Sequence, residues 1–173
     1  MNNTFAMAAA AACLFASVSV SAQDKPVDWT PVFKNWENGC DDSKMEDQLR
    51  KSLFVFSNGK VRLGKVVLPE PYRSAVGQPK LTNHGDYSTI TLPVRGNYYG
   101  ITIVEAGYYA GHENGINGKY LLLDTPIQNA KKSLRQVKFK RYEDTEGLGV
   151  DFIADISANK NKMRTNVVCD TSM

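Results

Sequence analysis

The chain lacks the short motifs that mark common enzyme classes. It has no Gly-x-Ser-x-Gly turn, no phosphate-binding loop, no dinucleotide fingerprint and no Cys-x-x-Cys pair. These absences leave no reaction to assign, although a serine or aspartate nucleophile needs no such motif. We predict no cofactor and no metal, and we favour a protein that is not an enzyme.

Charge is missing from the first 22 residues, which contain no Lys, Arg, Asp or Glu. Phe5 to Val20 is a run of apolar or small residues, and Val20-Ser21-Ala22 places small residues where a signal peptidase cleaves. We predict a signal peptide over residues 1–22 and a periplasmic or extracellular protein. Two alternatives stay open. In the first, the run of 16 residues is an uncleaved membrane anchor, although about 18–20 residues are needed to span a bilayer. In the second, Cys13 carries a lipid.

Cysteine is scarce, with three in the whole chain. Removal of the signal peptide leaves Cys40 and Cys169. In an oxidising compartment two cysteines pair by default, so we predict a Cys40–Cys169 disulfide. It would connect the start of the domain to its last strand.

The net charge of +3 is too small to indicate a nucleic-acid partner. The length after cleavage fits one domain, and no further segment is predicted to span a membrane. We divide the remaining chain into an N-terminal arm over residues 23–39 and a single domain over residues 40–173. Trp29, Phe33 and Trp36 anchor the arm.

Two segments show helical periodicity. Asp41, Asp42 and Ser43 can begin a helix, and an apolar stripe follows before Ser57-Asn58-Gly59 ends it: Met45, Leu49, Leu53 and Phe56. Thr125-Pro126 predicts the start of a second helix that ends near Val137.

The other segments alternate with a period of two, as strands do. Strands are expected over 61–68, 87–94, 98–109, 120–123, 149–156 and 163–169, and Pro93 is expected at a strand end or sheet edge. Turn signals such as Asn114-Gly115 separate them. The sequence therefore predicts an α+β domain with a mainly antiparallel sheet of five to seven strands, two amphipathic helices and one disulfide.

Two kinds of side chain suggest sites in the turns. His84 and His112 lie beside glycine and acidic residues, as a metal site or a catalytic base would need. Six of the eight tyrosines fall between Tyr87 and Tyr120, where they could form an amphipathic binding surface. The simpler interpretations are solvated turns and ordinary strand composition.

Two surfaces are our candidate binding sites. The first is an exposed hairpin tip formed by Tyr108, Tyr109, His112, Glu113 and Asn114. The second is a basic helix with Lys131, Lys132 and Arg135, followed by Lys138, Lys140 and Arg141. The competing interpretation of the helix is a solvated face whose charge suits its C-terminus.

Three functions remain open on the sequence. The first is a small exported binding protein, such as an inhibitor or immunity factor that acts on an envelope protein. The second is a module that binds an anionic envelope polymer or a glycan. The third is a small hydrolase or metal protein that uses His84, Asp86, His112 and Glu113.

Overall fold

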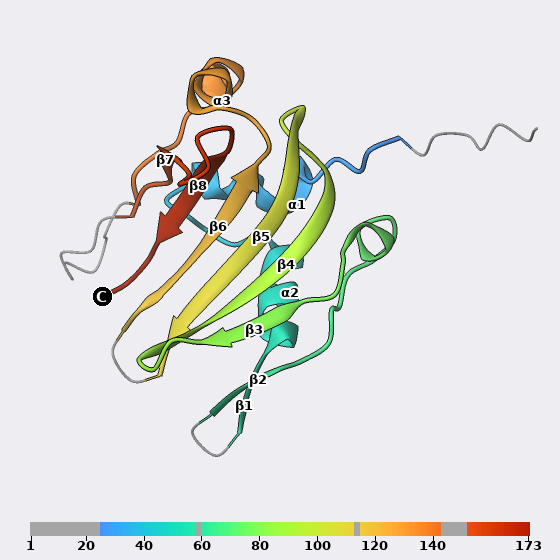
Figure 1. Ribbon diagram of the computed structural model, residues 1–173, viewed down its shortest axis with the longest axis vertical. Helices are drawn as coiled ribbons and strands as arrows, with labels where there is room; N and C mark the ends of the chain where they lie inside the picture. The colour runs from blue at the N-terminus through green and yellow to red at the C-terminus, as the bar shows by residue number, and fades with distance from the viewer. Residues whose placement is uncertain (1–24, 58–59, 113–114, 143–151) are drawn as a thin grey trace, which may run out of the picture.

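A six-stranded antiparallel sheet forms the centre of the protein (Figure 1). The computed structural model describes residues 25–57, 60–112, 115–142 and 152–173. The strand order is β3-β4-β5-β6-β8-β7. The strands are β3 (Lys80–Asn83), β4 (Tyr87–Tyr98), β5 (Ile101–Gly111), β6 (Asn117–Leu123), β7 (Asp155–Ala158) and β8 (Thr165–Asp170).

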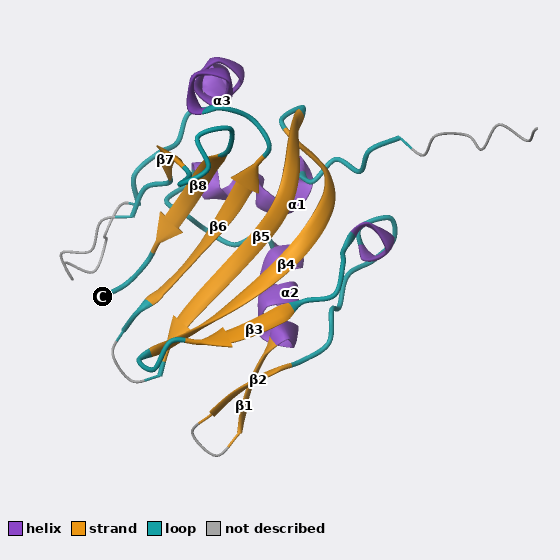
Figure 2. Ribbon diagram, in the orientation of Figure 1, coloured by secondary structure: helices purple, strands orange, loops and turns teal. Residues whose placement is uncertain are grey.

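Helices cover one face of this sheet. In Figure 2, α1 (Thr30–Phe33) and α2 (Lys44–Leu53) lie behind the sheet, and α3 (Ile127–Ser133) lies at one end of it. Short 3₁₀ turns follow α1 and α3, and a third precedes β3: η1 (Lys34–Glu37), η3 (Leu134–Gln136) and η2 (Arg73–Ala75). The predicted α+β class, the antiparallel sheet and the disulfide are confirmed.

The core lies between the sheet and α1, η1 and α2. Trp29, Phe33 and Trp36, the predicted anchors of the N-terminal arm, are fully buried there. They pack with Leu49 and Leu53 of α2 and with alternate side chains of the strands. Alternation along β4 and β5 supplies this apolar face, because successive strand residues point to opposite sides of a sheet.

The disulfide connects the two sides of this core. The Cα atoms of Cys40 and Cys169 are 5.5 Å apart, and both side chains are buried. Cys40 precedes α2, and Cys169 lies in β8 opposite Lys119. The disulfide therefore holds the segment before α2 against the sheet.

The first predicted helix is too long. It ends at Leu53, and Phe54–Ser57 forms β1, which pairs with β2 (Lys60–Leu63) as a separate two-stranded sheet. Phe54, Val55 and Phe56 are aromatic or β-branched residues that favour strands. Their strand preference outweighs the continued helical spacing of Phe56.

Smaller corrections concern strand ends and caps. Strand β3 lies outside the predicted strands, and β4 continues past Pro93 to Tyr98 through an irregularity between Pro93 and Gly96. Pro126, not Thr125, is the N-cap of α3, which passes into η3 after Ser133. The predicted hairpin near the end of the chain is present as β7 and β8, and residues 149–151 of that prediction lie outside the described residues.

Candidate functional site

The start of α2 is fixed by a serine cap. Ser43 Oγ accepts a hydrogen bond from the backbone N–H of Glu46 at 3.1 Å and donates one to the carbonyl oxygen of Val32 at 2.6 Å. The first bond satisfies an otherwise unpaired donor of the first turn. The second connects this turn to α1.

A buried carboxylate lies one turn into the same helix. Glu46 has no exposed surface and accepts hydrogen bonds from Trp36 Nε1 at both carboxylate oxygens. Burial raises the pKa of Glu46 from 4.5 to about 8, and the opposing effect of Lys119 is smaller. The ammonium nitrogen of Lys119 lies 3.5 Å from Glu46 Oε2 and 5.0 Å from the centre of the Trp36 ring.

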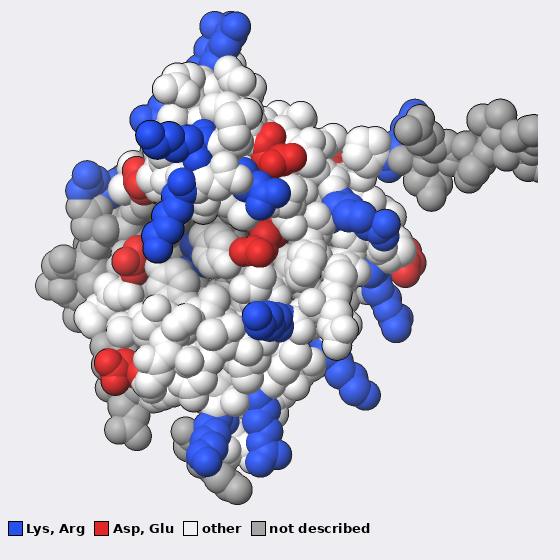
Figure 3. Space-filling view, in the orientation of Figure 1, with Lys and Arg blue, Asp and Glu red and all other residues white. Residues whose placement is uncertain are grey.

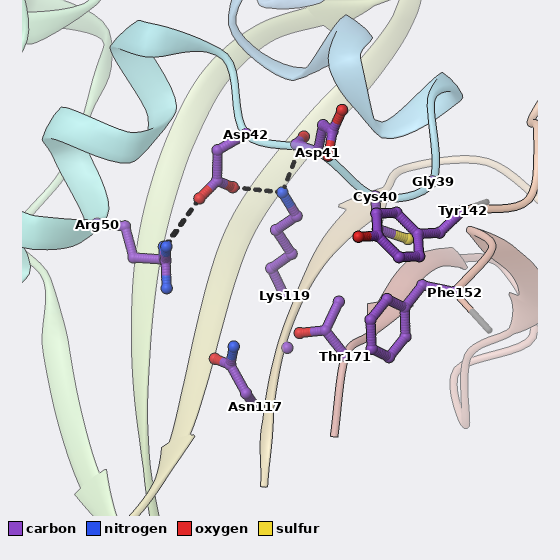
Figure 4. A pocket seen from close by; sticks show the side chains of 11 residues that line it. Gly39, Cys40, Asp41, Asp42, Arg50, Asn117, Lys119, Tyr142, Phe152 and Thr171 are labelled. Carbon is purple, nitrogen blue, oxygen red and sulfur yellow. Dashed lines mark hydrogen bonds and ion pairs between the residues drawn. The ribbon is translucent and has the colours of Figure 1, made fainter. Parts of the chain in front are cut away.

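Lys119 and Arg50 hold a second carboxylate between them. Figure 4 shows Asp42 between Lys119 of β6 and Arg50 of α2. Arg50 Nη2 lies 2.9 Å from Asp42 Oδ2, and Lys119 Nζ also donates to the carbonyl oxygen of Asp41 at 3.1 Å. These contacts attach α2 to the sheet by charged groups as well as by packing.

A pocket of about 300 Å³ opens beside this group. Its walls include Asp42, Arg50 and Lys119, together with Tyr142 and Phe152 (Figure 4). Its charged side chains already contact one another, so no ligand is needed to neutralise them. We therefore assign the charged group a structural role in holding α2.

Helix α2 leads directly into the β1–β2 hairpin. The N–H of Phe54 still donates to the carbonyl oxygen of Arg50, and Gly64 N–H donates to the carbonyl oxygen of Leu53 at 2.8 Å. A Cβ atom on Gly64 would lie 2.0 Å from the backbone oxygen of Ser52. Glycine is thus required where the return strand passes the end of the helix.

The hairpin extends from the lower end of the molecule, away from the six-stranded sheet (Figure 1). Its register places Phe54 opposite Leu63 and Phe56 opposite Val61, so one face of the ribbon is wholly apolar. The Phe54 and Phe56 rings stack at 6.3 Å. Phe56 is 63% exposed, and Val55 and Leu63 are 44% and 37% exposed.

Basic residues accompany these apolar side chains. Residues 48–69 contain five Lys or Arg and no Asp or Glu. Lys60, Arg62 and Lys65 are exposed and have no ion-pair partner in the described part of the chain. Figure 3 shows basic side chains at the end of the molecule where Figure 1 places the hairpin. We call this set, with Phe54, Val55, Phe56, Val61 and Leu63, the β1–β2 surface.

A cleft separates the hairpin from the end of the large sheet. Its volume is about 310 Å³, and Phe54 and Phe56 face Ala110 and Asn117 across it. Lys51 also borders it and pairs with Asp47 at 2.8 Å. An apolar side chain of a partner could occupy this cleft beside the Phe56 ring.

The predicted hairpin tip is only partly at the surface. Tyr108 is 1% exposed and points into the core, so its prediction as an exposed tip residue is wrong. The strand register explains this, because Tyr108 shares its face with Ile90 and Lys119. Tyr109 points to the opposite face, where its ring lies over Gly118. Glu113 and Asn114 lie outside the described residues.

The two histidines lie in adjacent turns and have separate partners. The N–H of His112 donates to the carbonyl oxygen of Asp86 at 3.0 Å, which brings the two turns together. The His84 ring stacks on Tyr87 at 4.5 Å, whereas His112 Nε2 lies 3.0 Å from Ser88 Oγ. Among the described residues no group of three His, Cys, Asp or Glu side chains could hold a metal.

The predicted basic helix is solvated. Lys131, Lys132 and Arg135 are exposed at the end of α3 and in η3, while Ala130 and Leu134 face the core. Their positions suit the C-terminal end of the helix. This arrangement is compatible with either interpretation of the basic run.

Three comparisons with known proteins found no match. No protein-family model, no curated protein and no solved structure matches this chain. Within the described residues no helix is long and apolar enough to cross a membrane.

The β1–β2 surface was missed by the sequence reasoning. Phe56 continues the helical spacing of Met45, Leu49 and Leu53, so the sequence predicted that Phe56 belongs to the helix. The signal that could have found the hairpin is Asn58-Gly59 between Phe54-Val55-Phe56 and Val61, a common two-residue hairpin pattern. The sequence also shows that residues 48–69, around this pattern, contain no Asp or Glu.

Proposed function

We propose that this is a small exported protein that binds another protein of the cell envelope and acts as an inhibitor or immunity factor. The observation that carries the proposal is the β1–β2 surface. A projecting ribbon with an exposed phenylalanine, two exposed aliphatic residues and cations that pair with no described residue is typical of a protein interaction site.

The position of the hairpin supports the same function. An isolated two-stranded hairpin is marginally stable in water, so it gains from a firm base. Here the base is α2, which is capped by Ser43 and attached to β6 through Asp42 and Lys119. The hydrogen bond from Gly64 to Leu53 holds the return strand. The hairpin is thus presented before a partner arrives.

The alternative glycan surface has less support. Tyr108 is buried, and the rings of Tyr109 and Tyr120 lie over Gly118 and Gly107. Tyr120 also donates to Glu105 Oε1 at 2.6 Å. These rings fill gaps in the sheet, so fewer are free to stack on sugars. We therefore favour a protein partner over an envelope polymer.

The proposal includes export. A Cys40–Cys169 disulfide is compatible with an oxidising compartment. Mass spectrometry of protein from the envelope fraction should give an N-terminus at Gln23. An intact Met1 or a lipid on Cys13 would contradict this part of the proposal.

The binding test uses a photocrosslinking amino acid at position 56 and, as a control, at position 163. Met163 is an exposed apolar residue in the β7–β8 turn, remote in sequence from the hairpin. Crosslinking in the cell envelope should yield one protein from position 56 and none from position 163. With that partner purified, Phe56→Ser should raise the Kd at least tenfold, and Met163→Ser should leave it unchanged. Equal Kd values for the two variants would sink the proposal.

A further inference from the structure

We propose that the β1–β2 surface enters the acidic substrate cleft of a glycan-cleaving hydrolase and blocks access of the polymer. This inference rests on the proposed function and names the class of its partner. It draws on three properties of the hairpin, which are its shape, its charge and its exposed aromatic ring.

The shape is a narrow ribbon. Two paired strands lie about 4.8 Å apart, so the hairpin is one sheet thick and two strands wide. It projects from the body of the molecule rather than forming part of a flat face (Figure 1). A cleft that admits one polysaccharide chain is long and narrow, and a ribbon of this kind matches it better than a flat surface would.

The charge selects an acidic partner. Lys60, Arg62 and Lys65 are exposed on a segment that has no acidic residue between positions 48 and 69. Glycan-cleaving hydrolases generally place two carboxyl groups on either side of the scissile bond, within the substrate cleft. An arginine can bind a carboxylate through two parallel hydrogen bonds. We assign this contact to Arg62, which stands opposite Val55 on the ribbon.

The exposed ring supplies the apolar contact. Phe56 is 63% exposed and borders the apolar cleft between the hairpin and Ala110. Substrate pockets are lined largely by apolar and aromatic side chains. A phenylalanine that enters such a pocket loses its exposed surface to water, and that burial favours binding.

An anionic membrane surface is the competing partner, because basic and apolar side chains bind it as well. The β1–β2 surface carries one prominent ring and three cations that have no ion-pair partner among the described residues, and it stands above a concave cleft rather than a broad apolar face. We therefore commit to the enzyme and make the membrane an outcome of the test.

The experiment measures hydrolysis of purified peptidoglycan by lysozymes of several structural types and by a lytic transglycosylase. The full exported protein should inhibit at least one of them competitively, and chitotriose should displace it from that enzyme. Phe56→Ser and Arg62→Glu should each weaken inhibition at least tenfold. Met163→Ser and Lys160→Glu, both at exposed residues of the β7–β8 turn, are the matched controls, and both should inhibit as the unaltered protein does. An unchanged melting temperature will show that each variant is folded.

Three other results each count against the inference. If none of the enzymes is inhibited, the assignment of the partner as a glycan-cleaving hydrolase is overturned. If crosslinking at position 56 has then identified a different protein, the proposed function is retained without this inference. Binding that chitotriose does not displace overturns the cleft assignment and leaves protein binding intact. Sedimentation with vesicles of phosphatidylglycerol and phosphatidylcholine, lost in Phe56→Ser and coupled with no inhibition, overturns both.

Discussion

Trp36 donates its indole N–H to both carboxylate oxygens of Glu46, at 2.9 and 2.8 Å, and neither side chain is exposed. A tryptophan from η1 is thereby bonded to α2 within the core. Burial deprives the Glu46 carboxylate of hydration and so disfavours its charged form.

The first prediction is that stability decreases with rising pH. The pKa of Glu46 is raised to about 8 in the folded protein, against 4.5 for an exposed carboxyl group. The folded state therefore keeps a proton that the unfolded chain releases. The free energy of unfolding has its full value below pH 4.5 and decreases as the pH rises toward 8. Above that value the titration of Glu46 causes no further change. The loss is on the order of a few kcal/mol.

Urea unfolding between pH 5 and pH 9 measures this effect. Glu46→Gln should flatten the slope, since glutamine does not titrate. The control Glu70→Gln changes an exposed glutamate and should keep the slope of the unaltered protein. Equal slopes for Glu46→Gln and the unaltered protein would contradict the prediction.

The second prediction concerns the ion pair between Lys119 and Asp42. The Lys119 side chain is 6% exposed, so Lys119→Met removes a buried cation from the group and leaves Asp42 with Arg50 alone. Removing one partner of a buried pair costs roughly 3–5 kcal/mol. Lys131→Met, at an exposed lysine, should change the unfolding free energy by less than about 0.5 kcal/mol.

A double-mutant cycle separates this pair from general packing. Asp42→Asn should cost less in the Lys119→Met background than in the unaltered protein. Additive effects would show that the two residues do not stabilise each other.

The third prediction concerns Gly64 at the base of the hairpin. A methyl group there would approach the backbone oxygen of Ser52 to 2.0 Å, and backbone atoms cannot yield as a flexible side chain does. Gly64→Ala should lower the unfolding free energy by roughly 1–3 kcal/mol. At Gly77, by contrast, the nearest atom would be Pro93 Cβ at 3.1 Å, so Gly77→Ala should cost less. Calorimetric melting of the two variants makes the comparison, and a smaller loss for Gly64→Ala would refute it.

The fourth prediction concerns the disulfide. Cys40→Ser with Cys169→Ser opens a covalent loop across 129 residues of sequence. Loss of such a crosslink typically costs about 2–5 kcal/mol. Both side chains are buried, so a thiol reductant should act on the native protein much more slowly than on protein in guanidinium. Equal melting temperatures for the double variant and the unaltered protein would show that the bond has no stabilising role.

Much of the fold could be predicted from local pattern. The alternation around Ile90 and Leu92 and the run at Leu121 identified strands, and the pairing of cysteines followed from their number. These features are set by short-range sequence. The disulfide and the antiparallel arrangement were therefore accessible without coordinates.

The candidate site was harder to find, because its apolar residues fit both the spacing of a helix and the alternation of a strand. Phe56 continues a helical stripe and also alternates with Phe54, so the spacing alone does not decide its structure. Tyr108 and Tyr109 are neighbours on opposite faces, and only the register reveals which ring is buried. No local pattern connects Trp36 with Glu46, which share a hydrogen bond, or Lys119 with Asp42, which form an ion pair.

The two cysteines enclose almost the whole domain in sequence. Cys40 precedes every strand of the large sheet, whereas Cys169 lies in β8, which pairs with β6. The disulfide therefore closes a covalent ring of backbone that contains both sheets and all of α2 and α3. A protease that cuts the backbone once between Cys40 and Cys169 would leave two pieces that stay covalently joined until the disulfide is reduced.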